Sequence, residues 1–92
     1  MNFDAARVAK MVQAALRGCN PHAARARVIA DEVSRHPDGM WYVPISVMRD
    51  TEHMAAIYEA FSEVEDTMEE RESLDVLLVP RIIPFQKWED VA

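Results

Sequence analysis

The feature that most constrains this 92-residue chain is one apolar stripe between Asp50 and Ser73. Apolar side chains recur there at intervals of three and four, which is the spacing of one face of an α-helix. The members of the stripe are Met54, Ile57, Tyr58, Phe61, Val64 and Met68. Asp50 stands where an N-cap residue is favoured, and Glu52 falls in the first turn, near the positive end of the helix dipole. We predict a long helix that packs this stripe on another element.

Short apolar runs flank this helix in the sequence. Residues 41–48 alternate between two faces, which predicts a strand; one face holds Trp41, Val43, Ile45 and Val47. Residues 74–79 form a run that is too short and too aliphatic for another helix, and they predict a buried strand. Pro44 cannot donate a ladder hydrogen bond, so it indicates a sheet edge or a bulge. A right-handed crossover would make the two strands parallel, with the helix across one face.

The first 36 residues predict a helical hairpin. Residues 4–17 carry apolar side chains at helical spacing, and Gly18 stands where a left-handed helix cap is common. Asn20 and Pro21 favour the start of a second helix that runs to about Ser34. Its buried side would hold Ala26, Ile29, Ala30 and Val33. Residues 36–39 then predict a turn, because proline, aspartate and glycine follow one another there.

The predicted order is therefore helix, helix, strand, helix, strand (ααβαβ), which is an α+β domain. We divide this single domain into a basic helical hairpin over 1–36, a βαβ unit over 40–85 and a tail over 86–92. Two strands make a marginal sheet. We therefore expect either that the segment from Arg81 to Trp88 adds a strand or that a second copy of the chain extends the sheet.

Charge is divided unevenly along the chain, whose net charge is −6. Residues 1–36 hold six basic side chains against three acidic ones, whereas 37–92 hold four against thirteen. Such an acidic balance has the wrong sign for a protein that binds phosphate backbones. We predict instead that a basic protein partner binds an acidic helix face. This face is formed by Glu59, Glu63, Asp66 and Glu70.

Sequence motifs for catalysis and cofactor binding are absent. Only two glycines are present, which excludes a P-loop and a dinucleotide fingerprint, and no serine stands in a nucleophile elbow. Cys19 is the only cysteine, so it cannot form an internal disulfide, and its spacing to His22 does not by itself make a zinc site. We expect no enzymatic activity, no cofactor and no metal.

An alternative function is anion binding or catalysis at one end of the predicted sheet. Ligands of parallel α/β sheets bind beyond the carboxyl ends of strands, where a helix N-terminus offers free N–H groups. Two arginines, a histidine and a positive helix end would suit a phosphate or a carboxylate. The residues gathered there would be Arg49, Asp50, His53 and Arg81.

A second alternative is nucleic-acid binding through the predicted basic hairpin, which has the outline of a helix-turn-helix. Its basic residues are Arg7, Lys10, Arg17, Arg25, Arg27 and Arg35. However, the link between its helices lacks a distinctive turn signature, and the acidic third helix would repel a duplex. We do not expect nucleic acid as a partner.

Aromatic and aliphatic side chains near the ends of the predicted strands indicate a protein contact, because they cannot all enter one small core. They are Trp41, Tyr42, Ile82, Ile83, Phe85 and Trp88. The sequence thus predicts a non-enzymatic interaction or regulatory module that forms a homodimer, with the tail packed on its own subunit or on the other. No apolar stretch reaches the roughly 18 residues of a membrane span. The single cysteine and the lack of an apolar leader predict a cytoplasmic protein.

Overall fold

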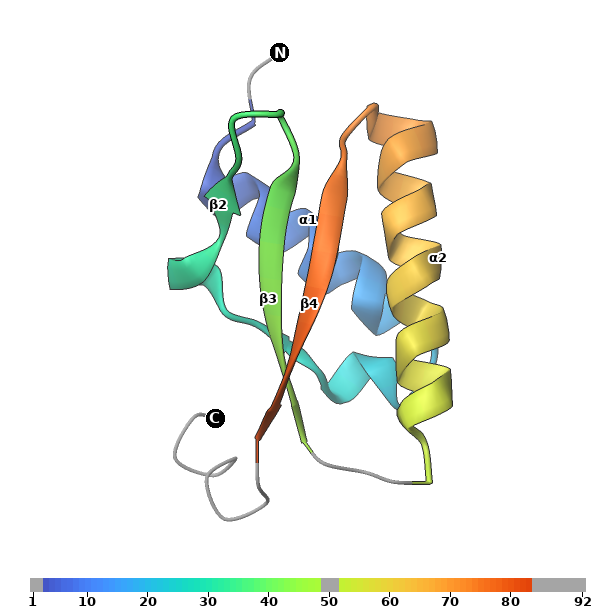
Figure 1. Ribbon diagram of the computed structural model, residues 1–92. Coiled ribbons are helices and arrows are strands. Elements are labelled where there is room, and N and C mark those ends of the chain that lie inside the picture. Colours follow the sequence, from blue (N-terminus) through green and yellow to red (C-terminus); the bar gives the residue numbers. More distant parts are fainter. Residues whose placement is uncertain (1–2, 49–51, 84–92) are drawn as a thin grey trace.

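A mixed four-stranded sheet forms the centre of the fold, and the computed structural model describes residues 3–48 and 52–83. The middle strand is β3 (Trp41–Met48), which pairs in parallel with β4 (Val76–Ile83). On its other side β3 pairs antiparallel with two short strands, β1 (Arg27–Val28) and β2 (Ser34–Arg35). The helices α1 (Ala5–Cys19) and α2 (Met54–Glu72) lie on the same face of this sheet (Figure 1). The domain is therefore α+β.

The elements β3, α2 and β4 form a parallel βαβ unit, as the alternation and the apolar stripe predict. The register runs without a slip from Trp41 beside Val76 to Met48 beside Ile83. Within the stripe, Ile57, Phe61, Val64 and Met68 are buried, whereas Tyr58 is 42% exposed. Ser73 closes α2 in the left-handed conformation with φ of 52°, and its N–H donates to the carbonyl of Glu69.

The second predicted helix is wrong. Residues 20–36 fold instead into a one-turn helix η1 (Ala23–Arg25), then β1, a second one-turn helix η2 (Ala30–Glu32) and β2. Asn20 does cap the first of these turns, because its Oδ1 accepts the N–H groups of His22 and Ala23. Helical propensity from alanine is a weak local preference. Pairing with β3 overrides it, because the backbone groups along that side of β3 would otherwise be left without partners.

Pro44 explains why β1 and β2 are separate strands. Only Val43 and Pro44 of β3 lie between the two paired stretches, whereas the opposing chain has the five residues 29–33. The carbonyl of Pro44 accepts the N–H of Ile29 at 2.8 Å. Pro44 has no N–H and cannot donate the second hydrogen bond of this antiparallel pair. The opposing chain therefore leaves the ladder there and turns through η2. Of the two alternatives that this proline indicates, the sheet edge is wrong, because β3 is paired on both sides; the ladder opposite Pro44 is interrupted by residues 29–33.

Side chains of the helices cap the sheet at both edges. At β1, Oε1 of Gln13 accepts the N–H of Val28 at 2.8 Å, and Nε2 of Gln13 donates to the carbonyl of Ala26 at 3.0 Å. At β4, Oε2 of Glu65 accepts the N–H of Leu78 at 3.0 Å. These backbone groups are therefore not available to pair with a further strand.

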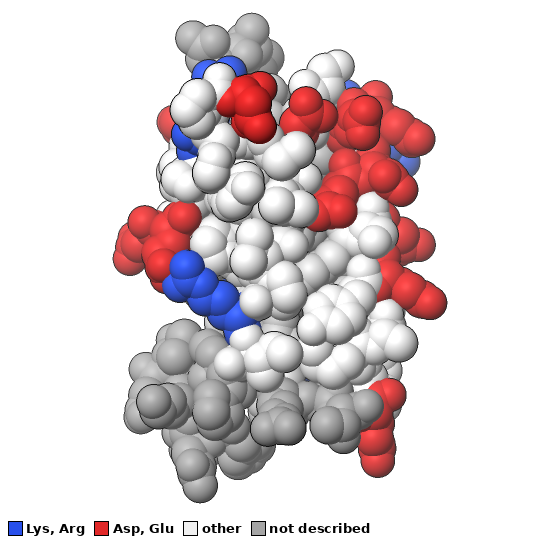
Figure 2. Space-filling model, in the orientation of Figure 1, with Lys and Arg blue, Asp and Glu red and all other residues white. Residues whose placement is uncertain are grey.

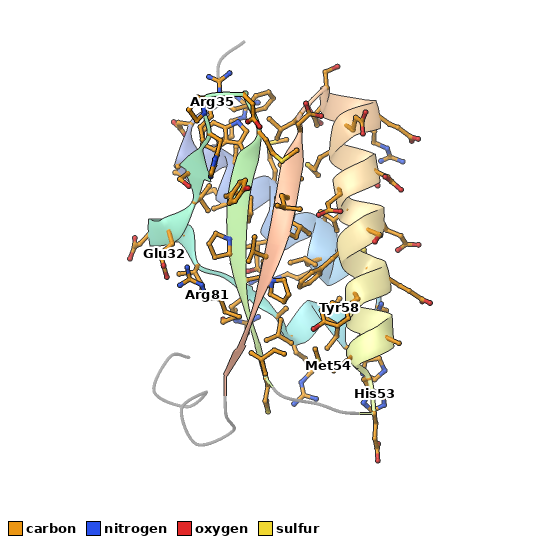
Figure 3. All side chains as sticks on the ribbon, viewed as in Figure 1. Glu32, Arg35, His53, Met54, Tyr58 and Arg81 are labelled. Atoms are coloured by element: carbon orange, nitrogen blue, oxygen red, sulfur yellow. The ribbon has the colours of Figure 1, made fainter. Side chains whose placement is uncertain are left out.

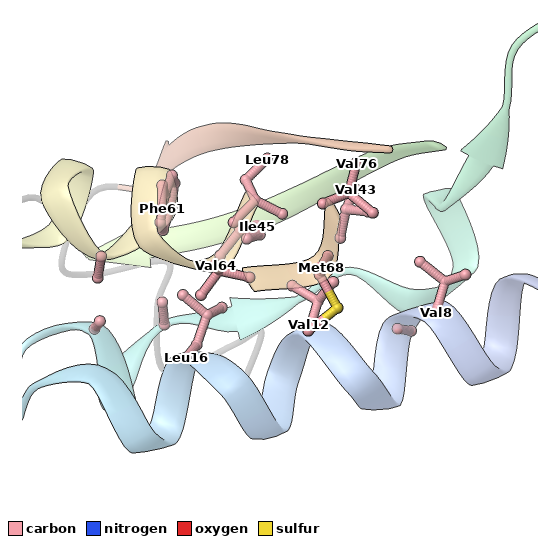
Figure 4. Close-up of a cluster of buried hydrophobic side chains, with 14 of the residues drawn as sticks. Val8, Val12, Leu16, Val43, Ile45, Phe61, Val64, Met68, Val76 and Leu78 are labelled. Carbon is pink, nitrogen blue, oxygen red and sulfur yellow. The ribbon is translucent and has the colours of Figure 1, made fainter. Parts of the chain in front are cut away.

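The core fills the space between the two helices and one face of the sheet (Figure 4). From α1 it takes Val8, Val12 and Leu16, which are completely buried. From the sheet it takes every second side chain, including Trp41, Val43, Ile45, Val76 and Leu78. No described helix or strand lies over the opposite face of the sheet (Figure 1).

Candidate protein-interaction surfaces

The acidic side chains of α2 form the most strongly charged surface in the described part of the chain. This helix holds seven acidic residues and one basic residue, Arg71, a balance of −6 that equals the net charge of the whole chain. Acidic side chains follow α2 along one flank of the molecule (Figure 2). The four predicted acidic residues are all exposed, and their spacing places them on one side of the helix; they are Glu59, Glu63, Asp66 and Glu70.

A groove of about 580 Å³ lies between α1 and the C-terminal half of α2. The helices are joined at one end, where Nδ2 of Asn20 donates to the carbonyl of Ala56 at 3.2 Å and Sγ of Cys19 lies 4.0 Å from the carbonyl oxygen of Ala60. They diverge from that point (Figure 1). The groove combines buried or half-buried apolar side chains with exposed charged ones, three acidic and one basic: Ala15, Val64 and Met68 with Glu63, Asp66, Glu72 and Arg71.

Gly18 forms part of the wall of this groove. The sequence predicts it as a left-handed cap, but it lies inside α1, its φ is not positive, and the helix ends at Cys19 with Asn20 as its C-cap. A Cβ built on Gly18 would meet nothing within 4 Å. Neither the backbone conformation nor the packing of the described residues therefore requires glycine, although glycine in a helix costs about 1 kcal/mol relative to alanine. Because glycine has no side chain, none projects into the groove at this position.

Cys19 lies at the closed end of the groove, where α1 meets α2. Burial raises the pKa of the Cys19 thiol, and the charge and hydrogen bond of Glu63 raise it further. A thiol held in its neutral form is a poor nucleophile. The environment of Cys19 therefore does not favour covalent chemistry.

The predicted anion-binding residues are only partly described. Arg49 and Asp50 lie outside the described residues. The ring of His53 stacks on that of His22, with centroids 3.9 Å apart and planes at 13°. Arg81 forms an ion pair with Glu32 of η2, on the side of the sheet away from His53 (Figure 3). The structure therefore does not bring His53 and Arg81 together.

A cavity among His22, Arg25 and Met48 measures about 30 Å³. A space of this size holds about one water molecule. Within residues 3–48 and 52–83, no three histidine, cysteine, aspartate or glutamate side chains are placed to share a metal ion.

The residues predicted for self-association have different environments. Trp41 is only 7% exposed and belongs to the core, with the guanidinium of Arg35 5.9 Å from its ring centroid. Tyr42 is half-buried and stacks on His36 at 3.6 Å. Ile82 is 49% exposed. The side chain of Ile83, together with Phe85 and Trp88, lies outside the described residues.

Two exposed apolar residues were not predicted, namely Tyr58 and Leu77, which is 37% exposed. Leu77 alternates with the buried Val76 and Leu78. Side chains of β4 therefore alternate between a buried and an exposed face, as in any strand. The sequence does not show this, because residues 76–79 are all aliphatic. The groove left no sequence signal at all, because it depends on how two helices diverge.

Comparisons with protein-family models, with curated proteins and with solved structures found no match to this chain. In the described part of the chain, neither helix is long and apolar enough to cross a membrane.

Proposed function

We propose that this protein is a non-enzymatic interaction module whose acidic α2 face binds a basic protein partner. The observation that supports this most is that the acidic residues stand where they weaken the helix. Three like-charged pairs lie four residues apart, each costing about 0.2–0.5 kcal/mol; they are Glu59 with Glu63, Glu65 with Glu69, and Asp66 with Glu70. Glu69, Glu70 and Glu72 also crowd the negative end of the helix dipole. A basic partner would relieve both costs.

The groove beside α2 supports the same proposal. Protein interfaces combine an apolar centre with a polar rim, and this groove has apolar Val64 and Met68 beside acidic Glu63 and Asp66. From residue 63 to residue 72 the helix rises about 13 Å, which matches two to three turns of a partner helix. The partner would place small apolar side chains in the groove and lysine or arginine side chains at its rim.

The experiment measures binding of a fluorescent amphipathic peptide made of lysine, leucine and alanine. The double variant Glu63→Lys/Asp66→Lys reverses two charges of the groove. The matched control Glu59→Lys/Glu70→Lys reverses two charges on the same helix that do not line the groove. All four positions are exposed, so circular dichroism should show an unchanged fold.

We expect the groove variant to weaken peptide binding at least tenfold in low salt and the control to weaken it two- to threefold, because the peptide contacts only the groove directly. Equal losses in both variants would show that the peptide is attracted to the overall negative charge of α2 and does not bind specifically in the groove. No loss in either variant would contradict the proposed function itself.

The predicted homodimer does not form part of this proposal, because nothing in the described residues supports it. The helix-turn-helix alternative also lacks support, since residues 20–36 do not form the second helix that it needs.

A further inference from the structure

A second hollow of the surface lies at the end of the molecule where β3 begins. The turn between β2 and β3, the link between α2 and β4 and the residues just before α1 come together at this end (Figure 1). They line a pocket of about 540 Å³. Small-molecule sites in proteins usually measure roughly 300–1,000 Å³. The pocket adjoins the acidic groove, because Arg71 and Glu72 line both.

Charged side chains of both signs line this pocket. Arg35 of β2 supplies one side of it (Figure 3). The end of α2 and its link to β4 supply the other side, with Arg71, Glu72 and Asp75. All four side chains are exposed, and among the described residues none of them forms an ion pair. The pocket is therefore positive at β2 and has a balance of −1 at the link, where the C-terminus of α2 adds the negative end of its dipole.

The pocket also has an apolar lining on a fixed backbone. Trp41 is buried and Phe3 is half-buried there. The N–H of Trp41 donates to the carbonyl of Asp75 at 2.9 Å, which joins β3 to the link. The N–H of Gly39 donates to the carbonyl of His36 at 2.9 Å, which closes the turn between β2 and β3. The charged groups thus stand on a preformed frame, as is usual for ligand sites.

We propose that this pocket binds a small zwitterion with an apolar body, namely a free amino acid or a short peptide with an apolar side chain. The guanidinium of Arg35 would pair with the carboxylate of the ligand, a group that suits its several N–H donors. The ammonium would lie beside Glu72 and Asp75, and the apolar body against Phe3 and Trp41. This site is distinct from the proposed peptide site, so the inference goes beyond the proposed function.

The mixed charge of the pocket favours a zwitterion over other small ligands. A simple anion would be repelled by Glu72 and Asp75, and a simple cation by Arg35 and Arg71. A ligand with both charges meets the opposite charge on each side of the pocket.

The experiment titrates isotope-labelled protein with phenylalanine and with the dipeptide leucyl-phenylalanine and follows the amide signals by NMR. We expect at least one of them to shift the signals of Gly39, Ser73 and Asp75, and the tighter ligand shows whether an amino acid or a peptide fits the separation of the two sides. The amide of that ligand lacks the carboxylate, and its N-acetyl derivative lacks the ammonium. Each derivative should bind at least about tenfold more weakly.

Two variants assign the two sides of the pocket. Arg35→Gln should weaken binding of the zwitterion about tenfold, to near the affinity of the amide. Asp75→Asn should weaken it a few-fold and reduce its advantage over the N-acetyl derivative. Neither residue lines the acidic groove, so both variants should bind the basic peptide as before. The control Arg17→Gln changes an exposed arginine of α1 that lines neither site and should leave zwitterion binding unchanged.

Three outcomes would overturn the inference. Signals of Gly39, Ser73 and Asp75 that neither ligand shifts at about 10 mM would show that the pocket takes no zwitterion. Equal affinity for the ligand, its amide and its N-acetyl derivative would show that the charges of the pocket do not contribute. Equal losses in Arg35→Gln and Arg17→Gln would show that the pocket does not hold the carboxylate. None of these outcomes bears on peptide binding in the acidic groove.

Discussion

Residues 20–36 and residues 54–72 both have a helical pattern in the sequence, yet only the second segment forms a long helix. In α2 the pattern consists of large side chains, and packing Ile57, Phe61 and Val64 rewards the helix with extensive apolar burial. In the earlier segment two of the four repeating residues, Ala26 and Ala30, are alanine, whose burial contributes little. That segment instead forms backbone hydrogen bonds with the edge of β3, and these stabilise it more than a helix would. Periodicity thus determines structure only where the side chains that repeat are large.

The largest expected effect tests whether apolar burial stabilises α2 more than it stabilises residues 20–36. Phe61→Ala should lower the free energy of unfolding by about 3–5 kcal/mol, because it removes a large buried ring and leaves a cavity. Val33→Ala, at a buried position of the earlier segment, should cost about 1–2 kcal/mol. Urea unfolding followed by circular dichroism measures both. Equal losses would mean that the earlier segment depends on apolar burial as much as α2 does.

An intermediate effect tests whether hydrogen bonds to the backbone stabilise residues 20–36. Gln13→Ala leaves the N–H of Val28 and the carbonyl of Ala26 without their partner. Partly buried groups left unpaired cost about 1–3 kcal/mol. The exposed Lys10→Ala on the same helix is the control and should change stability by less than about 0.5 kcal/mol.

Hydrogen exchange at the amide of Val28 gives a second measurement for this variant, and its protection should fall in Gln13→Ala. If Gln13→Ala and Lys10→Ala unfold at the same urea concentration, the hydrogen bonds of Gln13 do not stabilise β1.

The smallest effect concerns Cys19, the last residue of α1, whose Sγ lies beside the carbonyl oxygen of Ala60 in α2. Glu63→Gln removes the charge that raises the pKa of the Cys19 thiol, although burial, the larger cause, remains. The pKa should fall, and the rate of thiol labelling at mildly alkaline pH should rise a few-fold. Glu59→Gln, one turn away, is the control. An unchanged rate in Glu63→Gln would mean that burial alone controls the thiol.

The same pKa shift has a consequence for stability. Because the pKa of Cys19 is raised, the folded state holds the thiol proton at a pH where the unfolded state has lost it. The free energy of unfolding therefore falls as pH rises through the ordinary range of a thiol and up to its raised value. In Glu63→Gln this alkaline fall should be shallower.

The sequence was sufficient to predict several parts of the molecule. The stripe from Ile57 to Met68 and the alternation of residues 41–48 have the periods of a helix and a strand, and the short run before Pro80 cannot be a helix. Pro44 predicted an edge or a bulge, and the ladder is interrupted opposite it, because a proline has no N–H to donate in any sheet. The exposure of Glu59, Glu63, Asp66 and Glu70 follows from the helix period as well.

Other features could not be predicted from local patterns. Gln13 and Glu65 look like ordinary polar helix residues, and only the packed structure places each of them on a backbone group 13 or 15 residues away. Tyr58 shares the period of the buried stripe, but it lies where the packing of α2 leaves it half uncovered. The groove beside Gly18 depends on the angle between two helices.

By itself, the sequence determined the βαβ unit, the acidic helix and the break opposite Pro44, because each depends on the chemistry or the period of neighbouring residues. Only the tertiary structure decided that residues 20–36 form two short strands and two one-turn helices, that side chains cap backbone groups at the edges of the sheet, and that α1 and α2 leave a groove between them. These features arise from contacts between distant parts of the chain. In such contacts the free energy of pairing and packing with β3 outweighs the weak preferences of a short, alanine-rich segment.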